Sequence, residues 1–246
     1  MDYLTKTIEY YSNWVDISPE RFSSKQFIAQ RSKKREEAQK GYSKQFDLYY
    51  LSNDSVRIAS YNEKMDKYIK DLSEITTVNT VEKFFEGIFP GKVQHSIKFY
   101  FDKVSDSIDT TETVKLTKVD YEMYSRFYST ENNCEGEDIS WLKDFFERTV
   151  VKNYFWSIID NGTIISTTEI PDVPYMEDDI VEIGISTLLQ YRNKGNAKKV
   201  CTACLKQIIN DGKTPIWSCG NTNAKSIRLA ERIGFKYFAD VIMVSI

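Results

Sequence analysis

This sequence of 246 residues is poor in the residues that build disulfide frameworks, metal sites and imidazole-based active sites. Its four cysteines are scattered, and only Cys201 and Cys204 lie close together, which indicates no disulfide framework and favours a reducing compartment. The single histidine, His95, excludes most metal sites and most catalytic triads that need an imidazole base. We therefore expect a cytoplasmic protein without a metal cofactor.

An excess of positive charge and long apolar segments are also absent. The 33 basic residues are outnumbered by 36 acidic ones, so the net charge of -3 lacks the positive excess on which general nucleic-acid binding draws. No run approaches the roughly 18 uncharged apolar residues that a membrane span needs. The amino terminus has no basic start followed by an apolar stretch. We expect neither nucleic acid nor a membrane as a partner.

The chain has enough apolar side chains for a full core, since 41% of its residues are hydrophobic and 14% aromatic. In the first half, β-rich runs at 46–52 and 55–61 predict a hairpin. Helices are predicted at 63–75 and 81–89, and a strand at 96–102. The polar segment 104–113 then suggests a boundary. We expect two lobes, an α/β lobe of residues 1–110 and a second domain of residues 111–246.

The second half shows a sharper order of elements. Asn161-Gly162 between two β-rich runs is the strongest short hairpin signal. Alternation of apolar and polar residues predicts a strand, and apolar residues at helical spacing from residue 197 predict a helix. The predicted order is β-α-α-β-β-β-α-β-α-β, with elements at 114–120, 121–128, 141–149, 154–160, 163–170, 179–186, 197–210, 214–219, 223–233 and 236–246.

A basic turn with a glycine joins the strand at 179–186 to the helix that follows. Such a turn directs free backbone N–H groups and the positive end of the helix dipole at one point, which suits a pyrophosphate. Gly195 lets the backbone approach phosphates closely, and Ala197 keeps the first helical turn slim. From these residues alone, an ordinary structural turn is an equally good interpretation.

Two segments resemble the GNAT N-acetyltransferase superfamily. The family's acetyl-CoA motif is Gln or Arg, two residues, Gly, one residue, then Gly or Ala, and residues 192–197 match it. Residues 223–235, an Asn followed by a helix that closes with Gly-Phe, look like the second motif. Residues 216–235 are similar to the GNAT family that includes zwittermicin A resistance proteins. The resemblance covers residues 112–246, and for residues 1–110 a degenerate copy of the same fold is one interpretation.

The resemblance implies a mixed, mostly antiparallel twisted sheet flanked by helices, with acetyl-CoA as co-substrate. Strands 180–187 and 214–219 are expected to splay apart so that pantetheine can pair with the freed backbone. The implied cofactor-binding residues are Ile183, Gly184 and Ile185 along the pantetheine arm, Arg192, Asn193, Lys194, Gly195, Asn196 and Ala197 around the pyrophosphate, and Asn223 and Ser226 on the far side of the arm.

The same resemblance implies transfer of an acetyl group to a primary amine of a small molecule, with an antibiotic amine as one candidate. Glu182 is the candidate base, since many relatives carry a Glu on this strand, and Glu169 is the second candidate. Many relatives carry a Tyr where this chain has Ala230, so no general acid is assigned. A non-catalytic module that binds acyl-CoA or a partner is the alternative. The acceptor, the role of residues 1–110 and the oligomeric state stay open.

Two further groups have competing interpretations. Cys201 and Cys204 lie on the apolar stripe of one helix, which favours core packing over metal binding. The acidic run at 177–179 is either a hydrated loop, which we prefer, or a group that attracts a cationic amine.

Overall fold

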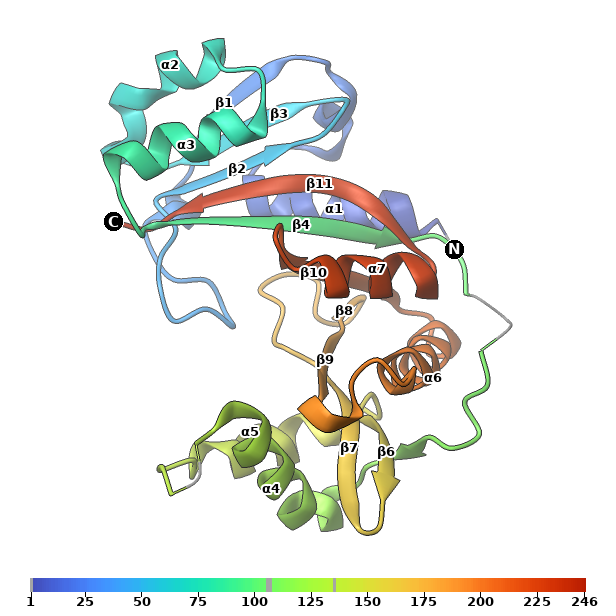
Figure 1. Cartoon of the computed structure of the whole chain (residues 1–246). Helices are drawn as coiled ribbons and strands as arrows, with labels where there is room; N and C mark the ends of the chain where they lie inside the picture. Colours follow the sequence, from blue (N-terminus) through green and yellow to red (C-terminus); the bar gives the residue numbers. More distant parts are fainter. Residues whose placement is uncertain (1, 105–107, 135) are drawn as a thin grey trace.

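The computed structural model describes residues 2–104, 108–134 and 136–246 (Figure 1). Its α-helices are α1 (Tyr3–Val15), α2 (Ile69–Glu74), α3 (Val78–Ile88), α4 (Tyr121–Asn132), α5 (Trp141–Val150), α6 (Asn196–Asn210) and α7 (Ala224–Ile233). Its strands are β1 (Phe27–Arg31), β2 (Leu48–Ser52), β3 (Arg57–Tyr61), β4 (Val93–Phe101), β5 (Val114–Lys115), β6 (Trp156–Asp160), β7 (Thr163–Glu169), β8 (Ile180–Glu182), β9 (Gly184–Thr187), β10 (Thr214–Gly220) and β11 (Phe235–Val244).

The described strands form two sheets. One has the order β1-β3-β2-β11-β4-β10-β8 and the other the order β5-β6-β7-β9. Pairing is antiparallel except between β1 and β3 and between β8 and β10. Helix α1 lies on one side of the larger sheet, and α6 and α7 lie on the other (Figure 1). The predicted class, a mixed and mostly antiparallel sheet flanked by helices, is confirmed.

Alternate side chains of the larger sheet enter different cores, as the two-residue period of a strand requires. On β10, Ile216 packs with α1 residues such as Tyr10 and Tyr11, whereas Trp217 packs with residues of α6 and α7. One hydrophobic core therefore lies between α1 and the sheet, and another lies between the sheet and helices α6 and α7.

Strands from the two halves of the chain interleave in the middle of the larger sheet, where β11 lies between β2 and β4. β11 pairs with β2 on one edge and with β4 on the other, and β4 also pairs with β10. Figure 1 shows β4 and β11 running side by side through the middle of the molecule. The boundary predicted at 104–113 lies partly outside the described residues. The division into two lobes near residue 110 stays a prediction. Strands from both halves of the chain pair with each other in the larger sheet, since β11 pairs with β2 and β4.

Most predicted elements are present, with three local corrections. Both predicted hairpins form, and Asn161 and Gly162 take the positive φ values of 47° and 73° that a two-residue hairpin turn needs. The helix predicted at 63–75 begins as a 3₁₀ turn and becomes α-helical only at Ile69. The strand predicted at 114–120 ends at Lys115, because Thr117 and Asp120 form a capping box that starts the next helix. The third correction, at 179–186, concerns the site.

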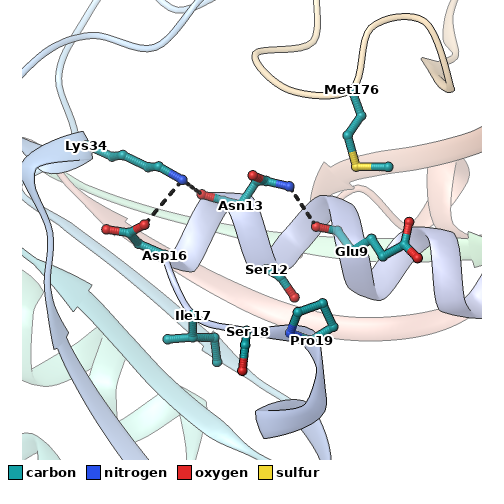
Figure 2. Close-up of a pocket in the computed structure, with 9 residues that line it drawn as sticks. All are labelled: Glu9, Ser12, Asn13, Asp16, Ile17, Ser18, Pro19, Lys34 and Met176. Atoms are coloured by element: carbon teal, nitrogen blue, oxygen red, sulfur yellow. Dashed lines mark hydrogen bonds and ion pairs between the residues drawn. The ribbon is translucent and has the colours of Figure 1, made fainter.

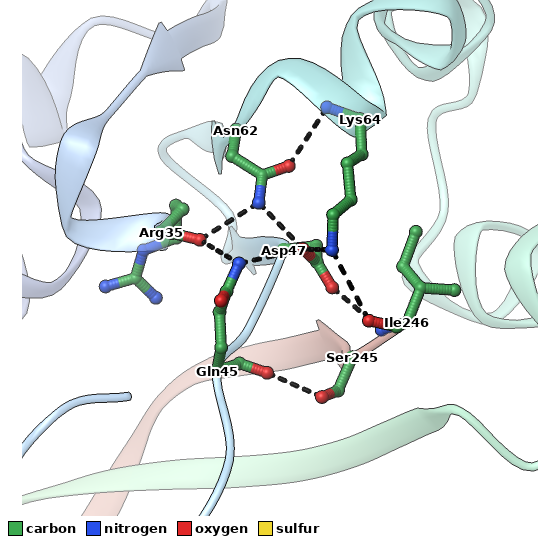
Figure 3. Close-up of polar contacts among 7 residues, drawn as sticks. All are labelled: Arg35, Gln45, Asp47, Asn62, Lys64, Ser245 and Ile246. Atoms are coloured by element: carbon green, nitrogen blue, oxygen red, sulfur yellow. Dashed lines mark hydrogen bonds and ion pairs between the residues drawn. The ribbon is translucent and has the colours of Figure 1, made fainter. Parts of the chain in front are cut away.

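A buried carboxylate fixes the carboxyl terminus beside the amino-terminal half (Figure 3). Asp47 is 1% exposed, and its Oδ1 accepts from Asn62 Nδ2 at 2.7 Å and pairs with Lys64 Nζ at 3.0 Å. Its Oδ2 accepts from the Ile246 backbone N–H at 2.7 Å. These bonds satisfy the buried charge, and so they hold the end of β11 in register with β2.

His95 of β4 lies opposite Ile242 of β11 and between two carboxylates. Its Nδ1 is 2.8 Å from Glu82 Oε2, and its Nε2 is 2.8 Å from Asp240 Oδ1. Burial opposes protonation of the ring, but hydrogen bonds to Asp240 and Glu82 outweigh it and raise the pKa of His95 above 6.5. The histidine is thus a structural link between α3, β4 and β11.

We predict that this link makes stability depend on pH. Because the folded pKa of His95 is raised, its contribution is fully present below pH 6.5 and is lost as the pH rises through the folded value. The free energy of unfolding should therefore fall as the pH rises above about 6.5. Urea denaturation across this range measures it. In His95→Gln the fall should be smaller, and an equal fall in both proteins would contradict the assignment.

A second prediction concerns the turn between α7 and β11. Gly234 has φ +110°, and a Cβ there would lie 1.8 Å from the carbonyl oxygen of Lys103. Gly234→Ala should lower the free energy of unfolding by about 3 kcal/mol or more, because backbone must move and the φ is strained. The control is Gly87→Ala in α3, where nothing lies within 4 Å, and it should stabilise by about 0.5–1 kcal/mol. Chemical denaturation of both variants decides the matter.

Candidate functional site

The segment predicted as one strand at 179–186 is two strands in different sheets. β8 pairs in parallel with β10, Ile180 to Glu182 opposite Thr214 to Ile216. The N–H of Ile183 still donates to the carbonyl of Ile216 at 3.2 Å. From Gly184 onward, β9 pairs with β7, while the rest of β10 pairs only with β4. The prediction of an unbroken strand is wrong, because one segment cannot follow two diverging neighbours; the splay that the resemblance implies is present.

The splay leaves one edge of β9 and one edge of β10 facing each other without a ladder of hydrogen bonds between them. We call the space between these two edges the gap. Hydrogen-bonding groups alternate along a strand, so the N–H of Ile185 points to the same side as that of Ile183, toward β10. No β10 residue pairs with it. Gly184, Ile185 and Ser186 are only partly buried. An extended ligand could pair with this edge as an added strand would.

The turn after β9 presents bare backbone at the start of α6. Gly195 is the N-cap residue with φ +86°, and no side chain caps the helix. The first N–H groups of a helix have no partner within it, so those of residues 196–198 stay available. Nothing would lie within 4 Å of a Cβ on Gly195, so the space in front of the turn is open. No acidic residue lies in the first turn. This arrangement suits a phosphate group.

The basic side chains of the turn are held by the protein. Arg192 Nε donates to the carbonyl of Thr187 at 2.8 Å, and its guanidinium pairs with Glu131 of α4. Lys194 Nζ lies 5.0 Å from the centre of the Tyr191 ring. Asn196 Nδ2 donates to the Tyr191 carbonyl at 3.2 Å. These contacts fix the shape of the turn, and its backbone amides remain free to meet a ligand.

The two predicted residues at α7 hold that helix against β10. Asn223 Oδ1 accepts from the Ser226 N–H at 3.1 Å and so caps α7. Ser226 Oγ accepts from Trp217 Nε1 at 3.0 Å. Their acceptor oxygens are therefore used within the fold, and contact with a cofactor arm stays a prediction for both.

Glu182 is the last residue of β8 before the strands diverge. It is half-buried on the α1 face of the sheet, where Ser218 of β10 donates a hydrogen bond to its carboxylate. Tyr10 and Tyr42 lie around it. Burial raises the pKa of both phenols, and the charge of Glu182 raises it further. Glu182 thus lies beside the gap among uncharged hydroxyl groups.

The second base candidate has a different environment. Glu169 ends β7 opposite Gly184, and Tyr124 of α4 donates to its Oε1 at 2.9 Å. Burial raises the pKa of Glu169, although the Tyr124 hydrogen bond opposes that. The geometry therefore brings Glu169 to the base of the gap, with its carboxylate turned toward α4.

Lys98 is the group that sequence reasoning missed. It is 6% exposed on β4, directly opposite Ser218, and lies one same-face position along the sheet from the row of Glu182, Ile216 and Tyr100. Burial lowers the pKa of Lys98, and attraction to Glu182 partly offsets this. The signal was a lone lysine within the apolar run of the β4 strand. Ala230 is fully buried and offers no proton donor.

The remaining candidates have structural roles. Cys201 and Cys204 are fully buried core residues, as predicted. In the acidic run, Glu177 pairs with Lys40 at the surface. Among the described residues no group of histidine, cysteine, aspartate and glutamate side chains is arranged to hold a metal ion. Within the same residues, every helix is too short or too polar to cross a membrane.

Two cavities among the described residues lie away from the gap. One, of about 460 Å³, lies on the outer side of α1 (Figure 2). There Lys34 Nζ donates to the Asn13 carbonyl at 2.9 Å and pairs with Asp16 at 3.3 Å, so its charges are already matched. The other, of about 260 Å³, lies between Tyr154 and Lys213. Neither is lined by Glu182 or the turn at Gly195.

Comparison with known proteins agrees with this geometry. A sequence model described as GNAT acetyltransferase matches residues 38–240, most of the chain. The chain belongs to the GNAT acetyltransferase family. The match extends through the interleaved strands β2 and β4 of the first half. The narrower resemblance to the family of zwittermicin A resistance proteins stays a prediction.

Individual relatives of this GNAT chain are distant. An uncharacterized N-acetyltransferase, YdfB, from Bacillus subtilis (strain 168) is 22% identical over 199 residues, covering 77% of this chain and 74% of YdfB. A GNAT-family acetyltransferase from Colwellia psychrerythraea has a TM-score of 0.53 at 16% identity, covering 62% of this chain and 56% of its own. A GCN5-related N-acetyltransferase from Sphaerobacter thermophilus has a TM-score of 0.54 at 8% identity. The match covers 68% of this chain and 56% of the Sphaerobacter chain. These likenesses show the fold.

We predict that Gly195→Asp abolishes acetyl-CoA binding, because its carboxylate would face the negative phosphates at the open turn. The matched control is Gly212→Asp, at the other end of α6, where φ is +71° and the space is equally open. It should bind as the parent protein does. Isothermal titration calorimetry with both variants checks this. Equal affinity of the two variants would show that the phosphates bind elsewhere.

Proposed function

We propose that this protein is an acetyl-CoA-dependent N-acetyltransferase that acetylates a primary amine of a small molecule by direct transfer in a ternary complex. The observation that carries the proposal is the split of one segment into β8 and β9 immediately before an uncapped glycine turn. The split offers backbone partners to a pantetheine arm, and the turn offers amides to a diphosphate. Family membership supports the same activity.

The residues around the gap fit the chemistry of acetyl transfer. Attack on a thioester needs a neutral amine, so a carboxylate must take a proton from the ammonium form. Glu182 lies at the point of divergence, and the hydroxyl of Ser218 orients its carboxylate. The freed backbone N–H at the gap can polarise a thioester carbonyl. The hydrogen bonds of the His95 ring go to Glu82, Asp240 and Asn221 and not to Cys219, so we infer direct attack by the amine without an acyl-enzyme.

The acceptor is a small molecule that reaches Glu182 from the α1 side of the sheet. Tyr10 and Tyr11, both buried in the core between α1 and the sheet, supply uncharged hydroxyl groups near this carboxylate. An amine-bearing antibiotic is one such small molecule. The cytoplasm is the proposed location, where acetyl-CoA is made available.

Glu182→Gln should lower kcat for acetyl transfer by about 10²–10⁴-fold at neutral pH, because the amide cannot accept the proton of the amine. Acetyl-CoA binding should be unchanged. A thiol-release assay with a panel of polyamines, aminoglycosides and aminopolyols measures turnover, and calorimetry measures binding.

Glu169→Gln is the matched comparison, since it keeps the Tyr124 hydrogen bond and removes the other candidate carboxylate. It should retain most activity. The reverse order of effects would assign the base to Glu169. Cofactor binding with no turnover on any amine, and no effect of Glu182→Gln, would favour a non-catalytic acyl-CoA-binding module.

A further inference from the structure

The structure buries a lysine in the middle of the larger sheet without a pairing partner among the described residues. Lys98 is 6% exposed, and none of the ion pairs and hydrogen bonds found among the described residues involves its Nζ, although this atom is not among the fully buried side-chain atoms that lack a partner. Taking an ammonium group out of water costs several kcal/mol when nothing pairs with it. Apolar residues such as Met would fill the same space at no such cost. A group retained at that cost is a candidate for function.

The register of the sheet puts Lys98 beside the gap. Its Cα lies directly opposite that of Ser218 on β10, and directly opposite residues share one face of a sheet. Ser218 in turn donates to Glu182 on β8. Ser218 is small, so the flexible four-carbon stem of the lysine can cross β10 toward β8. The electrostatic attraction between Lys98 and Glu182, two strands apart, agrees with that direction.

We propose that Lys98 donates the proton that the departing thiolate of CoA takes up. This inference rests on the proposed function, because it needs the thioester in the gap beside Ser218. It supplies the acid that the family pattern leaves unassigned, since the position of the usual tyrosine is the buried Ala230.

Each proton of the reaction can be followed between the amine, Glu182, Lys98 and the thiol. Glu182 first passes the proton of the ammonium form to water. The neutral amine then forms the C–N bond, and its surplus proton passes to the carboxylate of Glu182. Collapse of the tetrahedral intermediate breaks the C–S bond, and sulfur leaves with the electron pair and takes a proton from the Lys98 ammonium. Glu182 then gives its proton to water, and the Lys98 amine takes a proton from water. The net reaction moves one amine proton to the thiol, and both groups return to their starting states.

Other titratable groups surround Lys98, and a test must separate them. Glu182 of β8 and Cys219 of β10 act on Lys98 by their charge. Tyr100 of β4 and the α1 residues Tyr10 and Tyr11 lie on the same face of the sheet as Lys98, whereas His95, with Glu82 and Asp240, lies on the opposite face. The Lys98 ammonium is a positive charge, and a positive charge stabilises the thiolate form of CoA over the thiol form. The ionisation of bound CoA therefore reports on Lys98 directly and needs no acceptor.

The experiment is a pH titration of the CoA thiol bound to the whole protein. Thiolate is followed by its ultraviolet absorbance, with desulfo-CoA as the blank. In the parent protein, bound CoA should ionise about one unit lower than free CoA, because a cation within about 4–6 Å favours the anion. In Lys98→Met the shift should vanish while CoA still binds. Lys92→Met, on the exposed loop before β4, is the matched control and should titrate as the parent does.

Lys98→Arg separates charge from proton donation. It keeps the cation, so the thiol should still ionise early, but a guanidinium does not give up its proton, so kcat should fall at least tenfold. Identical thiol titration in the parent and in Lys98→Met, with CoA bound in both and both folded by circular dichroism, would overturn the proposal. The proposed function would survive that result. Absence of CoA binding to the parent protein would overturn both.

Discussion

The backbone of a β-strand must find hydrogen-bond partners on each edge, and at Ile183 this chain can no longer satisfy both. β8 follows β10, whereas β9 follows β7 into a second sheet. Hydrogen bonds on the facing edges of β9 and β10 are lost over several residues. A native sheet tolerates such a loss where water or a ligand replaces the missing strand. The site and the proposed chemistry depend on this break.

The elements on the two sides of the break differ in charge and in side-chain chemistry. α6 begins at Gly195 without a side-chain cap, so its free amides and helix dipole favour an anion at one end of the gap. Glu182, Ser218 and Lys98 lie on the α1 face, where Ser218 faces Lys98 across the sheet and donates a hydrogen bond to Glu182. The side chains of the α6–α7 face are apolar or tied into caps, as with Trp217 and Ser226. The proposed diphosphate and amine sites thus differ in chemistry and lie on the two sides of one break.

Sequence periodicity predicted most elements because each forms from local patterns. Asn161-Gly162 specified its hairpin, and the apolar stripe from residue 197 specified α6. The break at Ile183 could not be read from alternation, since 180–187 keeps a two-residue period while its partners change. Lys98 was missed for a similar reason. Its place beside Ser218 depends on the pairing of β4 with β10, about 120 residues apart along the chain, which no local pattern encodes.

A structure of the protein with bound CoA tests the central claim most directly. The account predicts the diphosphate against the backbone amides of residues 194–197 and the pantetheine arm between β9 and β10, paired with Ile185. It also predicts that β8 and β9 keep their separate partners. CoA bound elsewhere, or β9 closed onto β10 with no room for the arm, would contradict it.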